Sequence, residues 1–295
     1  MRFLGNVLAT VIGIFVFMML SFFGIILIGV IFGGDSETVE VENNSVIELN
    51  LSDISDDYAG KYSDPWVTAF SERKKIGLTD VINAIEIAET DDAIKGISIL
   101  NTNSSLGMAQ SKELRDALNR FKKSGKFIYS YANSYSQKEY YLNSVATSIY
   151  INPIGELDFK GLSTEVMFFK DFQEKSGLKM EVIRHGKYKS AVEPFLENKM
   201  SDANKEQTMA LLNGIWTNIV EDISKSRNIP VEKLNTIANG LLARTPKMAK
   251  AQNLIDYIAY EDVYHNAIRK VLKVDKDEDY NTVSIADYTQ KTTTT

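Results

Sequence analysis

The chain has 295 residues, of which 44% are hydrophobic, and it carries a formal net charge of −6 and no cysteine. This length allows one large domain or two small ones, and an acidic chain without a basic stripe argues against nucleic-acid binding. A sequence without cysteine forms no disulfide bonds, which fits an exported domain of this size as well as a reduced one.

The first predicted element is a membrane helix. No ionisable side chain occurs from Phe3 to Gly34, and the almost wholly apolar run 7–31 exceeds the ~20 residues that cross about 30 Å of hydrocarbon. A cleaved signal peptide is the alternative, but its apolar region would have about 7–15 residues before a small-residue cleavage site. We therefore expect a cytoplasmic segment 1–6, a transmembrane helix 7–31 and a polar linker 32–44. The cation Arg2 precedes the span, which favours a single pass with the globular body outside the cytoplasm.

Helices and strands then alternate along the chain. Amphipathic or buried patterns predict strands at 45–51, 96–100, 127–132, 148–151, 156–160 and 180–184. Helices are predicted at 78–90 with Thr79 as N-cap, 111–123, 137–145 and 165–176. Strands separated by helices imply right-handed parallel crossovers, and the fold class is therefore α/β.

The carboxy-terminal part is predicted to be helical. A helix over 203–226, capped by Ser201 or Asp202, is too long for a sheet crossover, and shorter helices follow at 231–238 and 245–251. The final stretch 278–295 is polar and ends in four threonines, so we expect a linker there. No repeat occurs within the chain.

The stretch 186–195 carries the most specific chemical signal. It places Lys189 among the side chains of Tyr188, Ala191, Val192, Pro194 and Phe195. Burial of a lysine against apolar groups lowers its pKa from roughly 10.4 by up to several units, and such an amine can take a proton from a nucleophile. The alternative is an ordinary solvated surface lysine.

Other candidate groups point to structural roles. Glu193 is expected to form an ion pair with Arg184 or Lys187, and Ser190 to cap either the amine or a helix. Neither His185 nor His265 lies in a metal-ligand spacing, and no phosphate-binding glycine loop occurs, so we assign neither a metal nor a cofactor. Tyr135, Tyr140 and Tyr141 are expected in the core or an interface.

The string 186–195 resembles the segment that carries the general-base lysine in the signal peptide peptidase A (protease IV) family, with Lys189 at the catalytic position. The resemblance covers roughly residues 1–290 and includes Tyr140-Tyr141-Leu142, Asn152-Pro153, Lys199-Met200-Ser201 and the region from Thr245-Pro246 to Asp256. The family has a one-domain form and a long form with two tandem domains. The chain is similar to the first half of the long form, in which the lysine comes from the first domain and the serine from the second.

This resemblance implies a crotonase/ClpP-like fold of repeated β-β-α units with a helical arm over 45–277, and a linker over 278–295 to a second peptidase domain. It also implies a bacterial cytoplasmic (inner) membrane protein with its catalytic domain on the periplasmic side. Substrates would be cleaved signal peptides or other apolar unfolded peptides. The assembly would be a homo-oligomeric ring of several protomers, such as a tetramer, next to the bilayer.

The chain departs from the family pattern at the nucleophile. The family's Ser-Gly-Gly-Tyr corresponds here to Gln137-Lys138-Glu139-Tyr140, and an amide cannot be acylated and released as a hydroxyl can. Ser136 is adjacent, but one position at a helix start turns a side chain by about 100°. The Pro-Gly-Gly of the oxyanion hole is replaced by Ser104-Ser105-Leu106, followed by a lone Gly107. We therefore expect this half to supply only the base and to be inactive by itself.

Two other functions remain open. The missing serine and glycines suit a non-catalytic crotonase-like scaffold or partner-binding domain. An acyl-CoA enzyme of the crotonase superfamily is disfavoured by the membrane helix and by the missing glycine pair.

Overall fold

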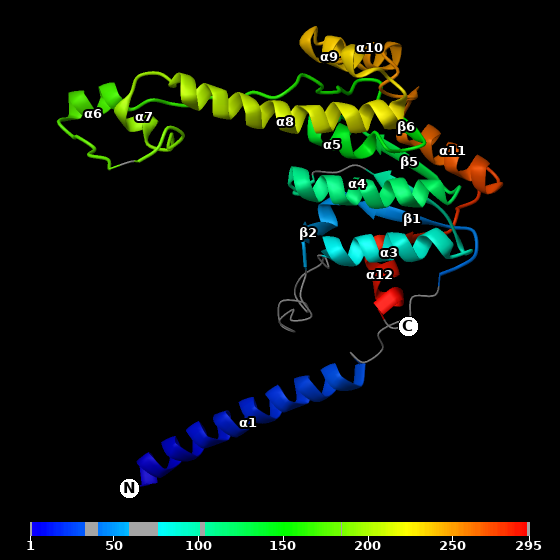
Figure 1. Cartoon of the computed structure of the whole chain (residues 1–295). Helices are drawn as coiled ribbons and strands as arrows, with labels where there is room; N and C mark the ends of the chain where they lie inside the picture. Colours follow the sequence, from blue (N-terminus) through cyan, green and yellow to red (C-terminus); the bar gives the residue numbers. More distant parts are fainter. Residues whose placement is uncertain (1, 33–40, 59–75, 101–103, 184, 294–295) are drawn as a thin grey trace. The chain divides into compact units, whose positions relative to one another are not determined.

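A computed structural model describes residues 2–32, 41–58, 76–100, 104–183 and 185–293. The chain divides into two compact units between Glu40 and Val41. The first unit contains helix α1, and the second contains the α/β body (Figure 1).

Helix α1 spans Arg2–Phe32, as the run of apolar residues predicts. Its segment Gly5–Leu27, 23 residues with a mean hydropathy of 2.6, has none of its side chains buried within the structure. At 1.5 Å per residue this segment measures about 34 Å, slightly more than the ~30 Å of a hydrocarbon core. By length and composition α1 could cross a membrane, either as an anchor or as a signal sequence.

The body is built on a parallel sheet. Among the described residues, six strands form it in the order β7-β6-β5-β4-β1-β8, and every neighbouring pair is parallel. The strands are β1 (Ser45–Asn50), β4 (Ile94–Leu100), β5 (Phe127–Ala132), β6 (Ser148–Ile151), β7 (Tyr257–Ile258) and β8 (Thr282–Ser284). The 3-10 turn η1 (Leu51–Asp53) leads from β1 into β2 (Ile54–Asp56), which pairs with β3 (Ile76–Gly77) in a second, two-stranded sheet of the described chain. This arrangement confirms the α/β class and is consistent with the expected ClpP-like fold.

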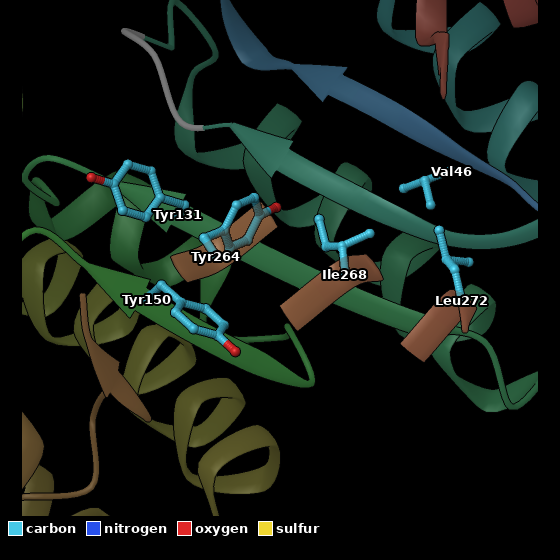
Figure 2. Close-up of a cluster of buried hydrophobic side chains, with 6 residues drawn as sticks. All are labelled: Val46, Tyr131, Tyr150, Tyr264, Ile268 and Leu272. Carbon is cyan, nitrogen blue, oxygen red and sulfur yellow. The ribbon is translucent and has the colours of Figure 1, made fainter. Parts of the chain in front are cut away.

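Helices cover both faces of the main sheet, which is why its central strands are apolar on both sides. One face packs against α3 (Leu78–Thr90), α4 (Met108–Lys123) and α5 (Gln137–Asn143), which lie in neighbouring rows in Figure 1. The other face packs against α11 (Glu261–Leu272) through a cluster shown in Figure 2: Val46, Tyr131, Tyr150, Tyr264, Ile268 and Leu272. Within this cluster the hydroxyls of Tyr264 and Ser98 share a hydrogen bond of 2.6 Å, so the buried polar atoms are paired.

The folded body continues into the segment that the sequence suggested was a linker. Strand β8 pairs with β1, and α12 (Ile285–Thr293) packs against α3. Val283, Ile285 and Tyr288 are buried, and the Tyr288 hydroxyl donates to Asp91 Oδ2 at 2.9 Å. A few apolar residues in a polar stretch therefore suffice to extend the sheet and core beyond residue 277.

An arm that extends away from the sheet contains α6 (Lys170–Ser176), α7 (Glu193–Leu196) and the first part of α8 (Asp202–Arg227). Helix α8 is capped by Ser201, as predicted, and buries Ile219, Val220 and Ile223 near its carboxy-terminal end. Its other end lies beside α6 and α7, away from the sheet (Figure 1). We call residues 162–211 the arm. Helices α9 (Val231–Asn239) and α10 (Pro246–Ala251) follow it.

Several predicted elements differ from the structure. Helix α3 has Gly77 as its N-cap because the Thr79 hydroxyl donates instead to Asp57 O at 2.8 Å. The strand expected at 156–160 is reduced to a bridge between Tyr135 and Leu157. Residues 180–183 form no strand, and the helix expected over 165–176 begins only at Lys170. Residue 184, the end of that expected strand, lies outside the described residues.

Candidate active site

The predicted base lies on the arm, in the loop that leads into α7. Gly186 has φ of +107°, a conformation that favours glycine, and the Lys189 N–H donates to Gly186 O at 3.5 Å in the turn that follows. The Lys189 side chain is exposed. This loop therefore leaves the lysine accessible to solvent.

The partial burial that the sequence suggested for Lys189 is not found within the described part of the chain. Tyr188 and Ala191 are also exposed, and Val192, Pro194 and Phe195 are only half-buried. The physical reason is local, since the described residues of 177–192 form neither helix nor strand, and Lys189 is exposed among them.

The two residues before Lys189 hold the loop to α8. Lys187 Nζ lies 3.3 Å from Glu206 Oε2 and 3.2 Å from the Tyr188 hydroxyl, and that hydroxyl also contacts Glu206 Oε1 at 3.3 Å. The hydrogen bond with Tyr188, and then the pairing with Glu206, raise the pKa of Lys187. Lys187 is therefore a surface cation and not a second candidate base.

Glu193, four residues after Lys189, is only 3% exposed. Of its two predicted partners, Lys187 binds Glu206, whereas Arg184 lies outside the described residues, so the pairing with Arg184 stays a prediction. Within the described residues the Glu193 carboxylate accepts from the Ser201 hydroxyl at 2.5 Å and from Asn204 Nδ2 at 3.0 Å. These hydrogen bonds join the start of α7 to the first turn of α8, and they fix the place where the loop with Lys189 ends.

Helix α6 completes the tip of the arm. The rings of Phe169 and Phe195 stack with centroids 5.7 Å apart, and the Phe169 N–H donates to Pro194 O at 2.6 Å. Gln173 Nε2 donates to Phe195 O at 2.8 Å. Although α6 buries none of its side chains fully, these contacts bind it to the segment that follows Lys189.

The residues expected to correspond to the nucleophile segment, Gln137 and the adjacent Ser136, lie in the body at the start of α5. Ser136 is the N-cap of that helix, where its hydroxyl accepts from Glu139 N at 3.3 Å, and Glu139 Oε2 accepts from Ser136 N at 2.9 Å. This reciprocal pair is a capping box. Ser136 therefore has a structural role here, and the spacing Ser-x-x-Glu in the sequence was the signal for it.

Gln137 and Lys138 bind backbone of two neighbouring loops. The Gln137 side-chain oxygen accepts from Lys160 N and Gly161 N, both at 2.9 Å, and its Nε2 donates to Gly161 O at 2.8 Å. Lys138 Nζ donates to Leu106 O at 2.6 Å and to Ser104 O at 3.1 Å. Sequence reasoning placed Gln137 correctly at the start of the helix but did not anticipate these partners.

The segment matching the oxyanion loop is occupied by its own contacts. Gly107 is the N-cap of α4, and its N–H donates to Gln110 Oε1 at 2.7 Å. Leu106 is buried, and the Ser105 hydroxyl donates to Ile54 O at 3.1 Å. The N–H of Gly107 is thus directed at a side chain of its own helix, and residues 101–103, which precede this loop, lie outside the described residues.

A buried arginine connects α4 and α5 to the carboxy-terminal half of α8, which we call the arm helix because its first turns belong to the arm. Arg115, fully buried on α4, donates to Tyr141 O and Ser144 Oγ of the α5 region and to Asp222 O and Ser226 Oγ of α8. Burial lowers its pKa, but a guanidinium keeps its charge at neutral pH. Arg115 was missed because nothing in a helical pattern distinguishes a buried arginine from a surface one.

The aromatic residues near the start of α5 do form core, as predicted. Tyr135, Tyr140 and Tyr141 are buried, and the Tyr140 hydroxyl donates to Leu254 O at 2.8 Å. The structure therefore separates two groups of site residues. The loop with Lys189 lies at the end of α8 away from the sheet, whereas Gln137 and the 104–107 loop lie beside the sheet at α5 and α4 (Figure 1).

Residues 120–275 match the family described as Peptidase family S49. Over 220 residues, covering 71% of this chain, the chain is 36% identical to a Haemophilus influenzae protein named Protease 4, of which it covers 35%. It is 33% identical over 225 residues to Protease 4 of Salmonella typhi, covering 73% of this chain and 36% of that protein.

A plant protein is similar over a longer stretch. The chain is 30% identical over 248 residues, 84% of its length, to the Arabidopsis thaliana protein named Serine protease SPPA, chloroplastic, of which it covers 35%. The chain thus spans about a third of the length of these three curated relatives.

Proposed function

The chain belongs to peptidase family S49, and from this premise we propose that it forms the amino-terminal half of a membrane-anchored serine endopeptidase. Its role in that enzyme is to supply the general base, Lys189, while a second peptidase domain supplies the nucleophilic serine. The substrates are cleaved signal peptides and other apolar unfolded peptides.

One observation supports this proposal: Lys189 is exposed on the arm, away from the start of α5, where we expect the family's serine and where this chain has Gln137. A lysine acts as a base near neutral pH only when it is desolvated, and the loop around Lys189 does not provide this. A second domain or copy that covers the loop would provide both the missing hydroxyl and the missing burial.

The apolar surface of the arm supports the presence of such a covering body. Large apolar side chains are exposed along it, among them Met167, Phe172, Leu178, Ile183, Met209 and Leu211. Several large apolar side chains exposed on one segment favour an interaction site when they form a common surface. We therefore propose that the arm contacts the second domain and neighbouring protomers in a homo-oligomeric ring.

The chemistry follows from the groups involved. The neutral amine of Lys189 removes the proton from the serine hydroxyl as the oxygen attacks the peptide carbonyl carbon. The same amine, now protonated, gives that proton to the leaving peptide nitrogen. Water then hydrolyses the acyl-enzyme, with the lysine again as base.

Localisation follows from α1. We propose that this helix is retained as a single-pass anchor of the bacterial cytoplasmic membrane, with the body on the periplasmic side. An anchor would hold the peptidase next to the bilayer, where cleaved apolar signal peptides are released.

The test is Lys189→Met in the whole protein encoded by the gene, with Lys187→Met as the matched control. We expect Lys189→Met to lower kcat on an apolar peptide by about 10²–10⁴-fold, the usual contribution of a positioned base, without a change in Tm. Lys187→Met removes an exposed ion pair with Glu206 and an exposed hydrogen bond with Tyr188. Because exposed contacts of this kind contribute little to stability, this variant should keep its activity. Retained activity of Lys189→Met would refute the assigned role.

A second candidate function, a non-catalytic scaffold or partner-binding domain, is favoured by Gln137 and by the occupied 104–107 loop. A coding sequence that ends without a serine-bearing domain, together with no co-purifying serine-bearing chain, would favour it over the peptidase.

A further inference from the structure

We propose that Gln137 is a positioning residue: by binding the backbone at the root of the arm, it sets the path of the segment that carries Lys189. The catalytic part of this inference rests on the function proposed above. The structural part, that Gln137 orients the arm, stands on the contacts of the described residues alone.

The Gln137 amide binds Gly161 as a neighbouring strand would. Its oxygen accepts from the Lys160 and Gly161 N–H groups, and its Nε2 donates to the Gly161 carbonyl, with all three distances between 2.8 and 2.9 Å. A glutamine amide has both an acceptor and a donor, so it can satisfy the N–H and the C=O of one residue at once. A serine in this position has a shorter side chain and one hydroxyl, and it could not make this set.

The place of these contacts is where the chain leaves the body. Upstream, Asp158 N donates to Tyr135 O at 2.8 Å, and the Phe159 ring lies 5.5 Å from that of Trp216 on α8. Downstream, residues 162–168 form neither helix nor strand. Gly161 has φ of +88°, so the backbone can turn sharply at this residue, and an unrestrained glycine would leave the direction of the arm open. The Gln137 amide removes that freedom.

The next residue, Lys138, also binds the start of α5 to a neighbouring loop. Lys138 donates to the carbonyls of Ser104 and Leu106, so α5 binds the loop before α4 as well as the arm root. Two consecutive side chains thus fix the start of α5 relative to both loops. Position 137, where we expect the family's nucleophile, therefore has a structural role in this chain.

The experiment uses the whole protein with Gln137→Ala and Gln137→Glu. A carboxylate keeps both acceptor contacts but loses the donor to Gly161 O, so it should restore part of the effect. The matched control is Gln110→Ala, which removes another side-chain amide at a helix start, one that accepts from Gly107 N and donates to Asp57 away from the arm. Thermal unfolding checks that all three variants fold.

Three readouts separate positioning from simple stability. Hydrogen exchange in the peptide 157–163 should become about tenfold faster in Gln137→Ala, because hydrogen bonds to two amides are lost. The distance distribution between spin labels at Glu113→Cys on α4 and Lys175→Cys on α6 should broaden. Residues 1–295 contain no cysteine, and any cysteine elsewhere in the whole protein is first replaced by serine. The kcat should fall by about tenfold with KM within twofold, since misplacement of a base affects the reacting geometry.

Unchanged exchange, or an unchanged label distribution, in Gln137→Ala would overturn the proposal, and so would equal effects of Gln110→Ala. Full kcat in Gln137→Ala would overturn its catalytic part. If the unmodified protein had no peptidase activity, the proposed function would fail, while exchange and label distances would still decide whether Gln137 positions the arm.

Discussion

Replacing Arg115 by alanine should destabilise the protein strongly. Its guanidinium is fully buried and donates to acceptors on α5 and α8, including Ser144 Oγ at 2.8 Å and Asp222 O at 2.9 Å. Hydrogen bonds to a charged group contribute about 1.5–3 kcal/mol each, but they are not additive when one side chain makes them all. Each buried acceptor that loses its donor costs about 1–3 kcal/mol, and because these costs add only in part we expect a loss of about 3–5 kcal/mol.

The assay is urea unfolding of the detergent-solubilised chain, followed by tryptophan fluorescence. A loss of 3–5 kcal/mol at a slope of about 3 kcal/mol per molar urea lowers the midpoint by more than ~1 M. The matched control is Arg120→Ala on the same helix, whose partner Glu86 is 2.6 Å away but about half exposed, so its removal should cost less than about 1 kcal/mol. Equal midpoints for the two variants would refute the view that Arg115 joins the body to the arm helix.

Two further predictions concern glycine and tyrosine. Gly214→Ala should stabilise α8 by about 0.5–1 kcal/mol, because an added Cβ meets nothing within 4 Å, whereas Gly186→Ala, at φ +107°, should cost about 1–2 kcal/mol and speed tryptic cleavage of its loop. Urea midpoints of both variants check this, and shifts of the same sign would contradict it. Burial raises the pKa of Tyr135 and Tyr140, so the unfolded chain loses these protons first and the free energy of unfolding should fall as pH rises above about 10. Burial lowers the pKa of partly buried lysines such as Lys122, so their contribution to the free energy of unfolding rises with pH, but only up to about pH 10.5. Urea unfolding above that pH is therefore the decisive measurement. A free energy of unfolding that stays constant there would count against the argument.

The sheet and its flanking helices were predictable because their signals are local. Helix α3 has the predicted bounds Leu78–Thr90, and β5 has the predicted bounds Phe127–Ala132. Both pack against neighbours within the chain, so their apolar patterns match their burial. The N-cap of α3 was mispredicted because a backbone carbonyl distant in sequence, that of Asp57, binds the Thr79 hydroxyl.

The arm was predicted less well, for a physical reason. Its apolar residues follow the pattern of an ordinary helix, yet α6 is short and buries no side chain fully, because no other part of the described chain covers it completely. The same holds for Lys189, whose surroundings looked buried in the sequence but are exposed. Apolar patterning indicates that a surface will be covered, but not whether the cover comes from the same chain.

The role of Gln137 could not be read from the sequence at all. Its partners Lys160 and Gly161 lie more than twenty residues away and are bound through their backbone, so neither side chain gives a signal. The sequence indicated only that position 137 has no hydroxyl. The hydrogen bonds of Gln137 to the backbone became visible only in the folded structure.

The late pairing of β8 has a consequence for the chain while it is being synthesised and exported. Val46 pairs with Thr282, so one edge of β1 stays open until about 230 further residues have been translated, roughly 10–50 s at ordinary elongation rates. An open edge of a buried apolar strand is a template for intermolecular pairing. Nascent chains stalled between β4 and β8 should therefore be the aggregation-prone species, and they are where a holding chaperone would be needed.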